Sequence, residues 1–123
     1  MYKNKILNEN LINIDKEINN LVIDIDGVIA SIVADGNYEK AKPLKENIKY
    51  INNLKFHGKK IILFTARGSA TGKDWSETTK LQIKKWGVLY DQLLFGKPAG
   101  DIYVDDKAAT PVSLQILSEK YKK

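Results

Sequence analysis

The chain has 123 residues, of which 43% are hydrophobic and 28% charged, an ordinary mixture for one globular domain. It contains no cysteine, which excludes disulfides, thiolate chemistry and cysteine-ligated zinc and is typical of the reducing cytoplasm. The net charge of +5 favours anionic ligands, but the lysines form no aromatic-interleaved basic stripe of the kind that binds nucleic acid. No run approaches the roughly 20 apolar residues that cross a bilayer, so we expect no membrane partner.

The sequence divides into an expected N-terminal extension over residues 1–20 and a single domain over residues 21–123. The extension alternates Lys, Asn and Ile, and it lacks the continuous apolar core and small-residue cleavage site of a signal peptide. No internal repeat or linker interrupts the domain. We therefore expect a cytoplasmic protein with one domain.

Short apolar runs in this domain predict strands, and segments with helical periodicity lie between them. The first strand is a β-branched run that ends in Gly27, which is typical of a buried parallel strand. Gly58 is a natural stop for the first helix, Asp74 is a cap for the second, and Pro111 suits the first turn of the last. In chain order we expect a strand over 21–27, a helix over 43–57, a strand over 60–65, a helix over 74–86, strands over 92–95 and 101–104, and a helix from 110.

This alternation predicts parallel βαβ units and therefore an α/β, Rossmann-like fold with three layers, in which helices cover both faces of a parallel sheet. Ligands of such sheets lie beyond the carboxyl ends of the strands. Each expected strand ends in, or is followed by, polar residues that are distant in sequence from the others, namely Asp24 with Asp26, Thr65, Lys97, and Asp105 with Asp106. We expect these side chains to converge on one edge of the sheet.

Several carboxylates at one edge would repel one another and raise one another's pKa values unless a cation lies between them. Oxygen ligands without His or Cys favour a hard ion, and Mg²⁺ is the usual one at phosphate sites. We expect the ligands to be a carboxylate oxygen of Asp24, the backbone carbonyl of Asp26 and a carboxylate oxygen of Asp105. Asp101 precedes the apolar run 102–104, so we interpret it as a strand-start or turn acid.

Phosphoryl transfer accounts for these residue types. Asp24 is expected to attack phosphorus and form an aspartyl phosphate. Asp26 is expected to protonate the leaving oxygen and then to deprotonate the water that hydrolyses the intermediate. Thr65 and Lys97 are expected to bind the phosphoryl oxygens, because a hydroxyl, a backbone N–H and a fixed positive charge stabilise the developing negative charge. Asp106 is interpreted as a supporting acid that orients Lys97 or a metal-bound water.

The loop 65–75 is dense in anion-binding and hydroxyl groups beside the expected site. We expect Thr65, Ala66, Arg67 and Lys97 to bind the substrate. Arg67 is the only Arg in the chain, and its guanidinium fork suits a second anionic group on the substrate. The alternative is that Arg67 braces a loop carbonyl or an acid. Trp75 has two interpretations as well, stacking on a ligand or packing in the core.

Four segments resemble the ordered motifs of the haloacid dehalogenase superfamily: DIDGV at 24–28, LFTAR at 63–67, GKP at 96–98 and DIYVDD at 101–106. The resemblance spans roughly residues 21–109 and implies a Rossmann-like sheet, Mg²⁺ and an aspartyl-phosphate mechanism. The second acid, Asp26, resembles the phosphatase and mutase branches rather than the dehalogenase or ion-pump branches.

Segments 27–42 and 66–96 are too short for the cap domains of many superfamily members, so the chain resembles the capless subgroup. Capless members often act on large substrates or close the site with a neighbouring subunit, which makes a homo-oligomer, plausibly a tetramer, an expectation. Segment 27–42 has room only for a hairpin flap. RGSATGKDW and YVDDKA resemble short phosphatases of capsule and surface-polysaccharide biosynthesis, which implies a small phosphorylated substrate, either a sugar phosphate or a phosphorylated amino alcohol.

Two other functions fit parts of the pattern. A nucleic-acid 3′-phosphatase is suggested by the basic charge and an open site, although we expect nucleic acid not to be the partner. A receiver-like phosphoacceptor domain also uses acids, a hydroxyl and a Lys on a parallel sheet. In receivers, however, the acid pair comes on the first strand, the phosphoacceptor on the third and the Lys last, an order that differs from the one here.

Overall fold

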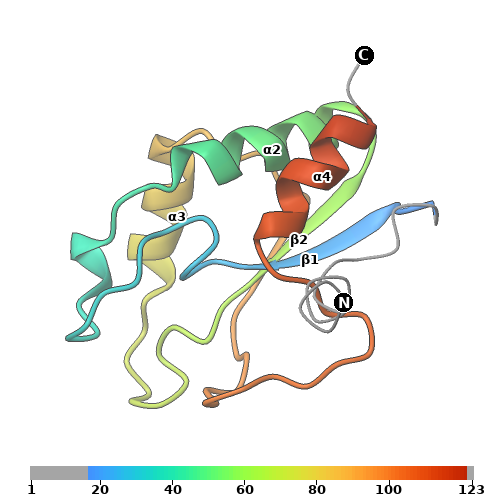
Figure 1. Cartoon of the computed structure of the whole chain (residues 1–123). Coiled ribbons are helices and arrows are strands. Elements are labelled where there is room, and N and C mark those ends of the chain that lie inside the picture. The colour runs from blue at the N-terminus through green and yellow to red at the C-terminus, as the bar shows by residue number, and fades with distance from the viewer. Residues whose placement is uncertain (1–16, 122–123) are drawn as a thin grey trace.

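The computed structural model describes residues 17–121, so most of the expected extension over 1–20 lies outside the described residues. Within this range the chain forms, in order, strand β1 (Asn20–Asp24), the 3₁₀ turn η1 (Tyr38–Lys40), helix α2 (Lys45–Phe56), strand β2 (Lys60–Phe64), helix α3 (Ser76–Lys85), strand β3 (Gln92–Leu94) and helix α4 (Val112–Lys120). The prediction of an α/β chain with a parallel sheet is confirmed (Figure 1).

The sheet has the strand order β1-β2-β3, and both pairs are parallel. Asn20 pairs with Lys60 and Asp24 with Phe64, so β1 and β2 end at the same level. The β2–β3 pairing runs from Ile62 with Gln92 to Phe64 with Leu94. All three strands therefore direct their following loops to one edge, where ligands of open parallel sheets bind.

One face of this sheet packs against the helices and forms the core. Ile23, Ile61 and Leu63 are buried there, and Leu21 and Leu93 pack against the same cluster. The helical members of the core come from all three helices: Ile48, Ile51 and Leu54 of α2, Ile83 of α3, and Leu114 and Leu117 of α4. Figure 1 shows α2 and α4 side by side above the strands, in agreement with the extensive contact between them.

The other face of the sheet is open among the described residues, so the prediction of helices on both faces is wrong for this part of the chain. Val22 is 64% exposed and Leu94 is 44% exposed, and the strand register places both on this face. The strand order explains the difference, because successive right-handed crossovers that advance in one direction place their helices on the same side. A helix on the second face would require a strand order that reverses.

The strand predicted over 101–104 is also wrong: these residues form an exposed loop, and the sheet of residues 17–121 has three strands. Ile102 is 78% exposed and Val104 is 90% exposed. The segment 95–111 instead loops away from the strands before it returns to α4 (Figure 1). A β-branched run favours a strand only when a neighbouring strand pairs with it, and no such pairing forms here.

Segment 27–42 contains turns and η1 rather than a hairpin, and two isolated bridges, Asp26 with Ala30 and Ala30 with Pro43, hold its ends together. It is too short for a cap domain, as the sequence predicts. Helix α3 begins at Ser76, and the Asp74 carboxylate accepts the Ser76 N–H at 2.9 Å as an acidic turn before the helix. No helix in the described part of the chain is long and apolar enough to span a membrane.

Candidate active site

A cavity of about 290 Å³ lies at the carboxyl ends of the strands, where the sequence predicts the site. Asp24 and Asp26 lie in its wall together with Tyr38, Trp75 and Tyr103. The remaining lining residues are small or carry a single hydroxyl: Gly36, Ala66, Gly68, Ala70, Thr71, Ala99 and Gly100. The cavity thus combines two carboxylates with aromatic walls and short side chains that leave room for a ligand.

Asp24 is the last residue of β1, and its position is fixed by the pairing of Asp24 with Phe64. Its side chain is 36% exposed, and the Lys97 Nζ lies 3.7 Å from its Oδ1. Burial raises the pKa of the Asp24 carboxyl, while the positive charge of Lys97 and a hydrogen bond from the Ile25 backbone oppose this change. A carboxylate that is only partly desolvated and faces a cavity is suited to nucleophilic attack.

Lys97 comes from the loop after β3, and backbone contacts attach this loop to the end of β2. The Lys97 N–H donates to the Thr65 carbonyl at 3.1 Å, and the Ser69 hydroxyl donates to the Lys97 carbonyl at 2.7 Å. The Lys97 ammonium also lies 4.0 Å from the centre of the Tyr103 ring. The structure thus brings Lys97 to Asp24, in the arrangement that the sequence predicts.

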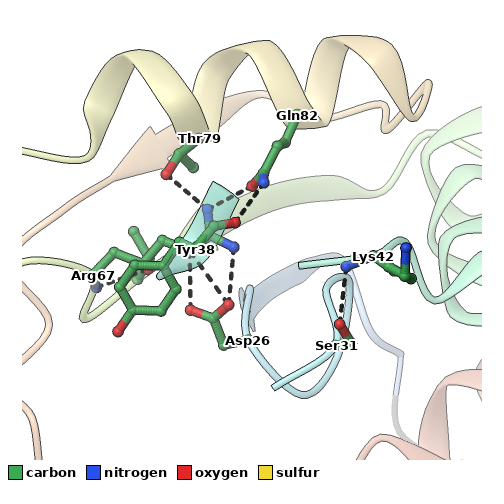
Figure 2. Close-up of polar contacts among 8 residues, drawn as sticks. Asp26, Ser31, Tyr38, Lys42, Arg67, Thr79 and Gln82 are labelled. Atoms are coloured by element: carbon green, nitrogen blue, oxygen red, sulfur yellow. Dashed lines mark hydrogen bonds and ion pairs between the residues drawn. The ribbon is translucent and has the colours of Figure 1, made fainter. Parts of the chain in front are cut away.

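Asp26 lies two residues beyond β1, and its carboxylate is held by Arg67 (Figure 2). The Arg67 Nη2 donates to Asp26 Oδ1 at 2.9 Å, and Nε donates to Oδ2 at 3.1 Å. This is a two-point ion pair in which the planar guanidinium matches the carboxylate. Each of the two neighbouring acids therefore has its own cation, Lys97 for Asp24 and Arg67 for Asp26.

Arg67 is directed at protein groups, and its expected contact with a substrate stays a prediction. Its side chain is fully buried, and Nη1 donates to the Thr79 Oγ1 at 3.0 Å and to the Gln82 Oε1 at 2.7 Å. With Asp26 as well, four of its five N–H donors have partners. The second interpretation of Arg67, that it braces an acid, is the one that the contacts support.

Thr65 and Ala66 lie beside one another but differ in access to the cavity. Thr65 is fully buried; its N–H donates to the Leu94 carbonyl at 3.0 Å, and its hydroxyl accepts the Arg67 N–H at 3.0 Å. It is not in the cavity wall, whereas Ala66 is. These contacts shape the loop after β2, and the expected contact of Thr65 with phosphoryl oxygens stays a prediction.

Asp105 and Asp106 lie in the exposed segment 95–111 and are absent from the cavity wall. The Asp105 Oδ1 accepts the N–H of Lys107 at 2.8 Å, as in a local turn. Residues 17–121 contain no group of three or more His, Asp or Glu side chains that could hold a metal ion. Of the expected Mg²⁺ ligands, Asp24 and Asp26 lie at the cavity and Asp105 does not, so the ligand set is incomplete in this arrangement. In the described part of the chain, no strand pairing fixes Asp105 at the edge of the sheet.

The aromatic walls of the cavity are the part of the site that the sequence did not reveal. Tyr38 packs edge-to-face on Trp75, with ring centres 5.1 Å apart and an interplanar angle of 89°. Trp75 is 7% exposed, as packing in the core predicts, and it also lines the cavity. Its stacking on a ligand stays a prediction. Tyr103 belongs to the run predicted as a strand, where its ring would have been assigned to the core. The sequence contained no signal for Tyr38, because η1 follows a segment without periodicity.

Comparisons with known proteins place the fold but not the family. No family model matches the chain. No curated protein matches it either. Among solved structures, an MCSG target from Vibrio cholerae has a TM-score of 0.66 at 21% identity, and the match covers 85% of this chain and 98% of that one.

Two further solved structures are chains of the Pnkp1/Rnl/Hen1 complex, described for one of them as an RNA repair complex. They have TM-scores of 0.52 and 0.53 at 23% and 20% identity. The matches cover 74% and 94% of this chain, and they span only 32% and 36% of those larger chains. At these identities the likeness is one of fold, namely an α/β domain with a parallel open sheet.

Proposed function

We propose that this protein is a Mg²⁺-dependent phosphomonoesterase of the haloacid dehalogenase type, without a cap domain, that works through an aspartyl phosphate. The observation that carries the proposal is Asp24 at the end of β1, in the wall of the cavity and 3.7 Å from the Lys97 ammonium. A carboxylate beside a fixed positive charge has the means to attack an anionic phosphoryl group, because the cation offsets the repulsion between them.

In the proposed reaction an Asp24 carboxylate oxygen attacks phosphorus, and the bond from phosphorus to the ester oxygen breaks. The reaction begins with Asp26 protonated on an oxygen lone pair that the Arg67 donors leave open, and the departing oxygen takes this proton and leaves as an alcohol. Asp26, now ionised, then takes a proton from water as that water attacks the phosphorus of the aspartyl phosphate. The bond from phosphorus to Asp24 breaks, inorganic phosphate leaves, and both acids return to their starting states.

Magnesium belongs to the proposal through the chemistry of its ligands. The Asp24 carboxylate and the Asp26 carbonyl are hard oxygen donors at the cavity, and the bound ion would screen the negative charge of the phosphate. Asp105 would complete the predicted set only with segment 95–111 closer to β1 than the structure has it. We therefore assign no step of the reaction to the metal, and its binding needs its own measurement.

The cavity favours a small substrate over a long polymer. Its volume of about 290 Å³ is at the lower end of the range for small-molecule sites. Aromatic walls beside short side chains suit a compact ring or chain that carries one phosphate, such as a sugar phosphate or a phosphorylated amino alcohol. The pathway of surface-polysaccharide biosynthesis, the cytoplasmic location and the homo-oligomer, plausibly a tetramer, are carried forward from the sequence as parts of this proposal.

A phosphate-release screen across sugar phosphates, amino-alcohol phosphates and p-nitrophenyl phosphate, with and without Mg²⁺, tests the function. The Asp24→Asn protein, purified in the same way, reports any contaminating phosphatase. We expect multiple turnovers that require Mg²⁺ and Asp24. Release of no phosphate from any ester would overturn the proposal, and a single phosphorylation of Asp24 without turnover would favour a receiver-like phosphoacceptor instead.

A nucleic-acid 3′-phosphatase is the second candidate, favoured by the likeness of the fold to chains of an RNA repair complex. A 3′-phosphorylated oligonucleotide in the same screen separates the two functions. Counterion release makes binding of a nucleic acid fall steeply with salt. A kcat/KM for the oligonucleotide that exceeds every small ester and falls steeply between 50 and 200 mM salt would favour this candidate.

A further inference from the structure

We propose that Arg67 is a positioning residue, which fixes the Asp26 carboxylate in one place so that Asp26 transfers protons in both halves of the reaction. This inference rests on the proposed function. It assigns a role to the single Arg of the chain, which the reaction described above leaves unused.

The contact between the two side chains fixes the carboxylate in two directions. The Arg67 Nη2 reaches Asp26 Oδ1 at 2.9 Å, and Nε reaches Oδ2 at 3.1 Å and Oδ1 at 3.3 Å (Figure 2). A carboxylate held by one donor can still rotate about its last bond. Held at both oxygens by a rigid planar fork, it keeps one orientation.

Arg67 is itself held from behind by helix α3. Its Nη1 donates to Thr79 at 3.0 Å and to Gln82 at 2.7 Å, and its side chain is fully buried. The guanidinium carbon also lies 4.7 Å from the centre of the Tyr38 ring. Gln82 closes the network because its Nε2 donates to the Tyr38 carbonyl at 2.7 Å. Helix α3 and the turn η1 together therefore determine where the Asp26 carboxylate lies.

The Lys97–Asp24 pair is looser than the Arg67–Asp26 pair, as the different roles of the two acids require. Lys97 approaches Asp24 at a single atom and at 3.7 Å, and the Asp24 side chain is 36% exposed. A nucleophile must advance toward phosphorus, and this loose pair permits that movement. A proton carrier that serves the leaving group and then the attacking water must be in the same place for both steps, and the Arg67–Asp26 pair supplies that rigidity.

Arg67→Lys separates charge from geometry. The ammonium keeps one positive charge, but as a compact point it cannot reach both Asp26 oxygens and the acceptors on α3 at the same time. We expect Asp26 to lose its fixed orientation while the cavity keeps its net charge. Proton transfer to the leaving oxygen should therefore suffer more than attack by Asp24.

The leaving group of the substrate makes this difference measurable. An alkyl phosphate needs its departing oxygen protonated, whereas p-nitrophenolate leaves without a proton. The quantity to compare is kcat/KM, which includes the steps up to departure of the alcohol and excludes hydrolysis of the aspartyl phosphate. For Arg67→Lys we expect a fall of about 100-fold with the alkyl phosphate and less than about 3-fold with p-nitrophenyl phosphate, because a positioned acid contributes about this much.

Lys59→Met is the matched control. Lys59 is a buried cation as well, paired with Glu17 at 3.0 Å, and it precedes β2, at the opposite end of that strand from the site. Removal of this pair should destabilise the fold without changing the ratio of the two kcat/KM values. Thr79→Val is the second variant, because it removes one acceptor of Arg67 and keeps the shape of the side chain. It should change the ratio in the same direction as Arg67→Lys, by a smaller factor.

Equal falls with both esters, no fall with either, or a gain with the alkyl ester in Arg67→Lys would overturn the positioning role. If Arg67→Lys does not fold at the assay temperature, as judged by circular dichroism, the ratio measured with Thr79→Val decides in the same way. A wild-type protein that hydrolyses neither ester would instead overturn the proposed function, so the two failures are distinguishable.

Discussion

Two regions carry acids of the predicted site: the end of β1 with the loop that follows it, and the segment 95–111 after β3. They hold these acids very differently. Asp24 ends a paired strand, Asp26 follows it, and both meet buried or half-buried cations. Asp105 and Asp106 lie in an exposed segment, where the one contact of the Asp105 carboxylate described above is with the backbone of Lys107. The two regions have similar acids, and their surroundings decide what those acids can do.

A strand ladder therefore positions a side chain far more firmly than the sequence of a motif does. β1 is paired with β2 along its whole length, so the residue that ends β1 has a fixed direction. Segment 95–111 is attached through Lys97 and then runs on without a strand partner.

Asp24→Asn should abolish turnover, with a loss of about 10³-fold or more in kcat, because an amide is a poor nucleophile and carries no charge. The measurement is phosphate release with the best ester of the screen. Glu119→Gln removes the same charge from an exposed position on α4. Because a surface substitution of this kind has little effect on the fold, kcat should stay within about 2-fold of wild type. Near wild-type turnover in Asp24→Asn would contradict the assigned role.

Lys97→Ala should lower kcat by about 100-fold, since it removes the positive charge 3.7 Å from Asp24 that would face the transferring phosphoryl group. The neighbouring Lys107→Ala, in the part of segment 95–111 beyond that attachment, is the control and should change kcat little. If both variants lose activity equally, the contrast between the attached and the exposed part of the segment fails.

Gly68→Ala should destabilise the protein more than Gly96→Ala, although both residues have a positive φ, 85° and 90°. A Cβ on Gly68 would collide with the Lys73 carbonyl oxygen, whereas a Cβ on Gly96 meets nothing within 4 Å. The left-handed backbone alone costs about 1–2 kcal/mol, so we expect Gly96→Ala to show about that loss. Gly68→Ala should exceed it in the free energy of unfolding measured with urea. Equal losses would show that the loop 66–73 relaxes as freely as segment 95–111.

Asp91 should give the start of β3 a pH-dependent stability. The Ile61 N–H at 2.7 Å, and then Lys55 at 2.9 Å, hold the pKa of the Asp91 carboxyl below its usual range. A lowered folded pKa means that the contribution is complete above the unfolded pKa of about 3.9 and is lost as the pH falls through the folded value.

The stability difference between wild type and Asp91→Asn should therefore be present at pH 6 and shrink below about pH 3.9. Urea midpoints at pH 6 and at a pH below about 3.9 measure this difference. Glu119→Gln is the control for the removal of one negative charge. A difference that grows at low pH would show that Asp91 is not stabilised in its ionised form.

Trypsin should cleave segment 95–111 before any other described site, and first at the exposed Lys107, because exposed loops are the preferred points of proteolysis. Arg67, which is 3% exposed, should resist cleavage as long as the domain is folded. Mass spectrometry of the first fragments measures the order. Protection of Lys107 by Mg²⁺ would indicate that the segment approaches the site when the ion binds, and would sharpen the contrast between the two regions into a difference between states.

Much of the framework could be predicted from local patterns. The β-branched run before Asp24 forms β1, the periodic residues Ile48, Ile51 and Leu54 form the buried stripe of α2, and Gly58 follows its end. The approach of Lys97 to Asp24 could be predicted as well, because parallel strands bring their carboxyl ends to one edge. These features depend on spacing along the chain, which the sequence contains directly.

Whether the run 102–104 forms a strand could not be predicted from local patterns. Its β-branched residues carry strand propensity, but a strand exists only with a partner, and the sequence does not name partners. The same limit applies to the side on which the helices pack, because strand order rather than composition determines it. The metal-ligand role of Asp105 depended on the expected strand over 101–104, and it stays a prediction.

By itself the sequence determined the α/β alternation, the parallel edge and the acids that follow β1, because periodicity and strand ends are local properties. Tertiary packing alone established that Arg67 pairs with Asp26, that Tyr38 and Tyr103 line the cavity, and that most of segment 95–111 is exposed. These outcomes depend on which surfaces meet across long distances in the chain. A guanidinium has the same charge in every environment, and its role is set by the partner that folding brings within reach.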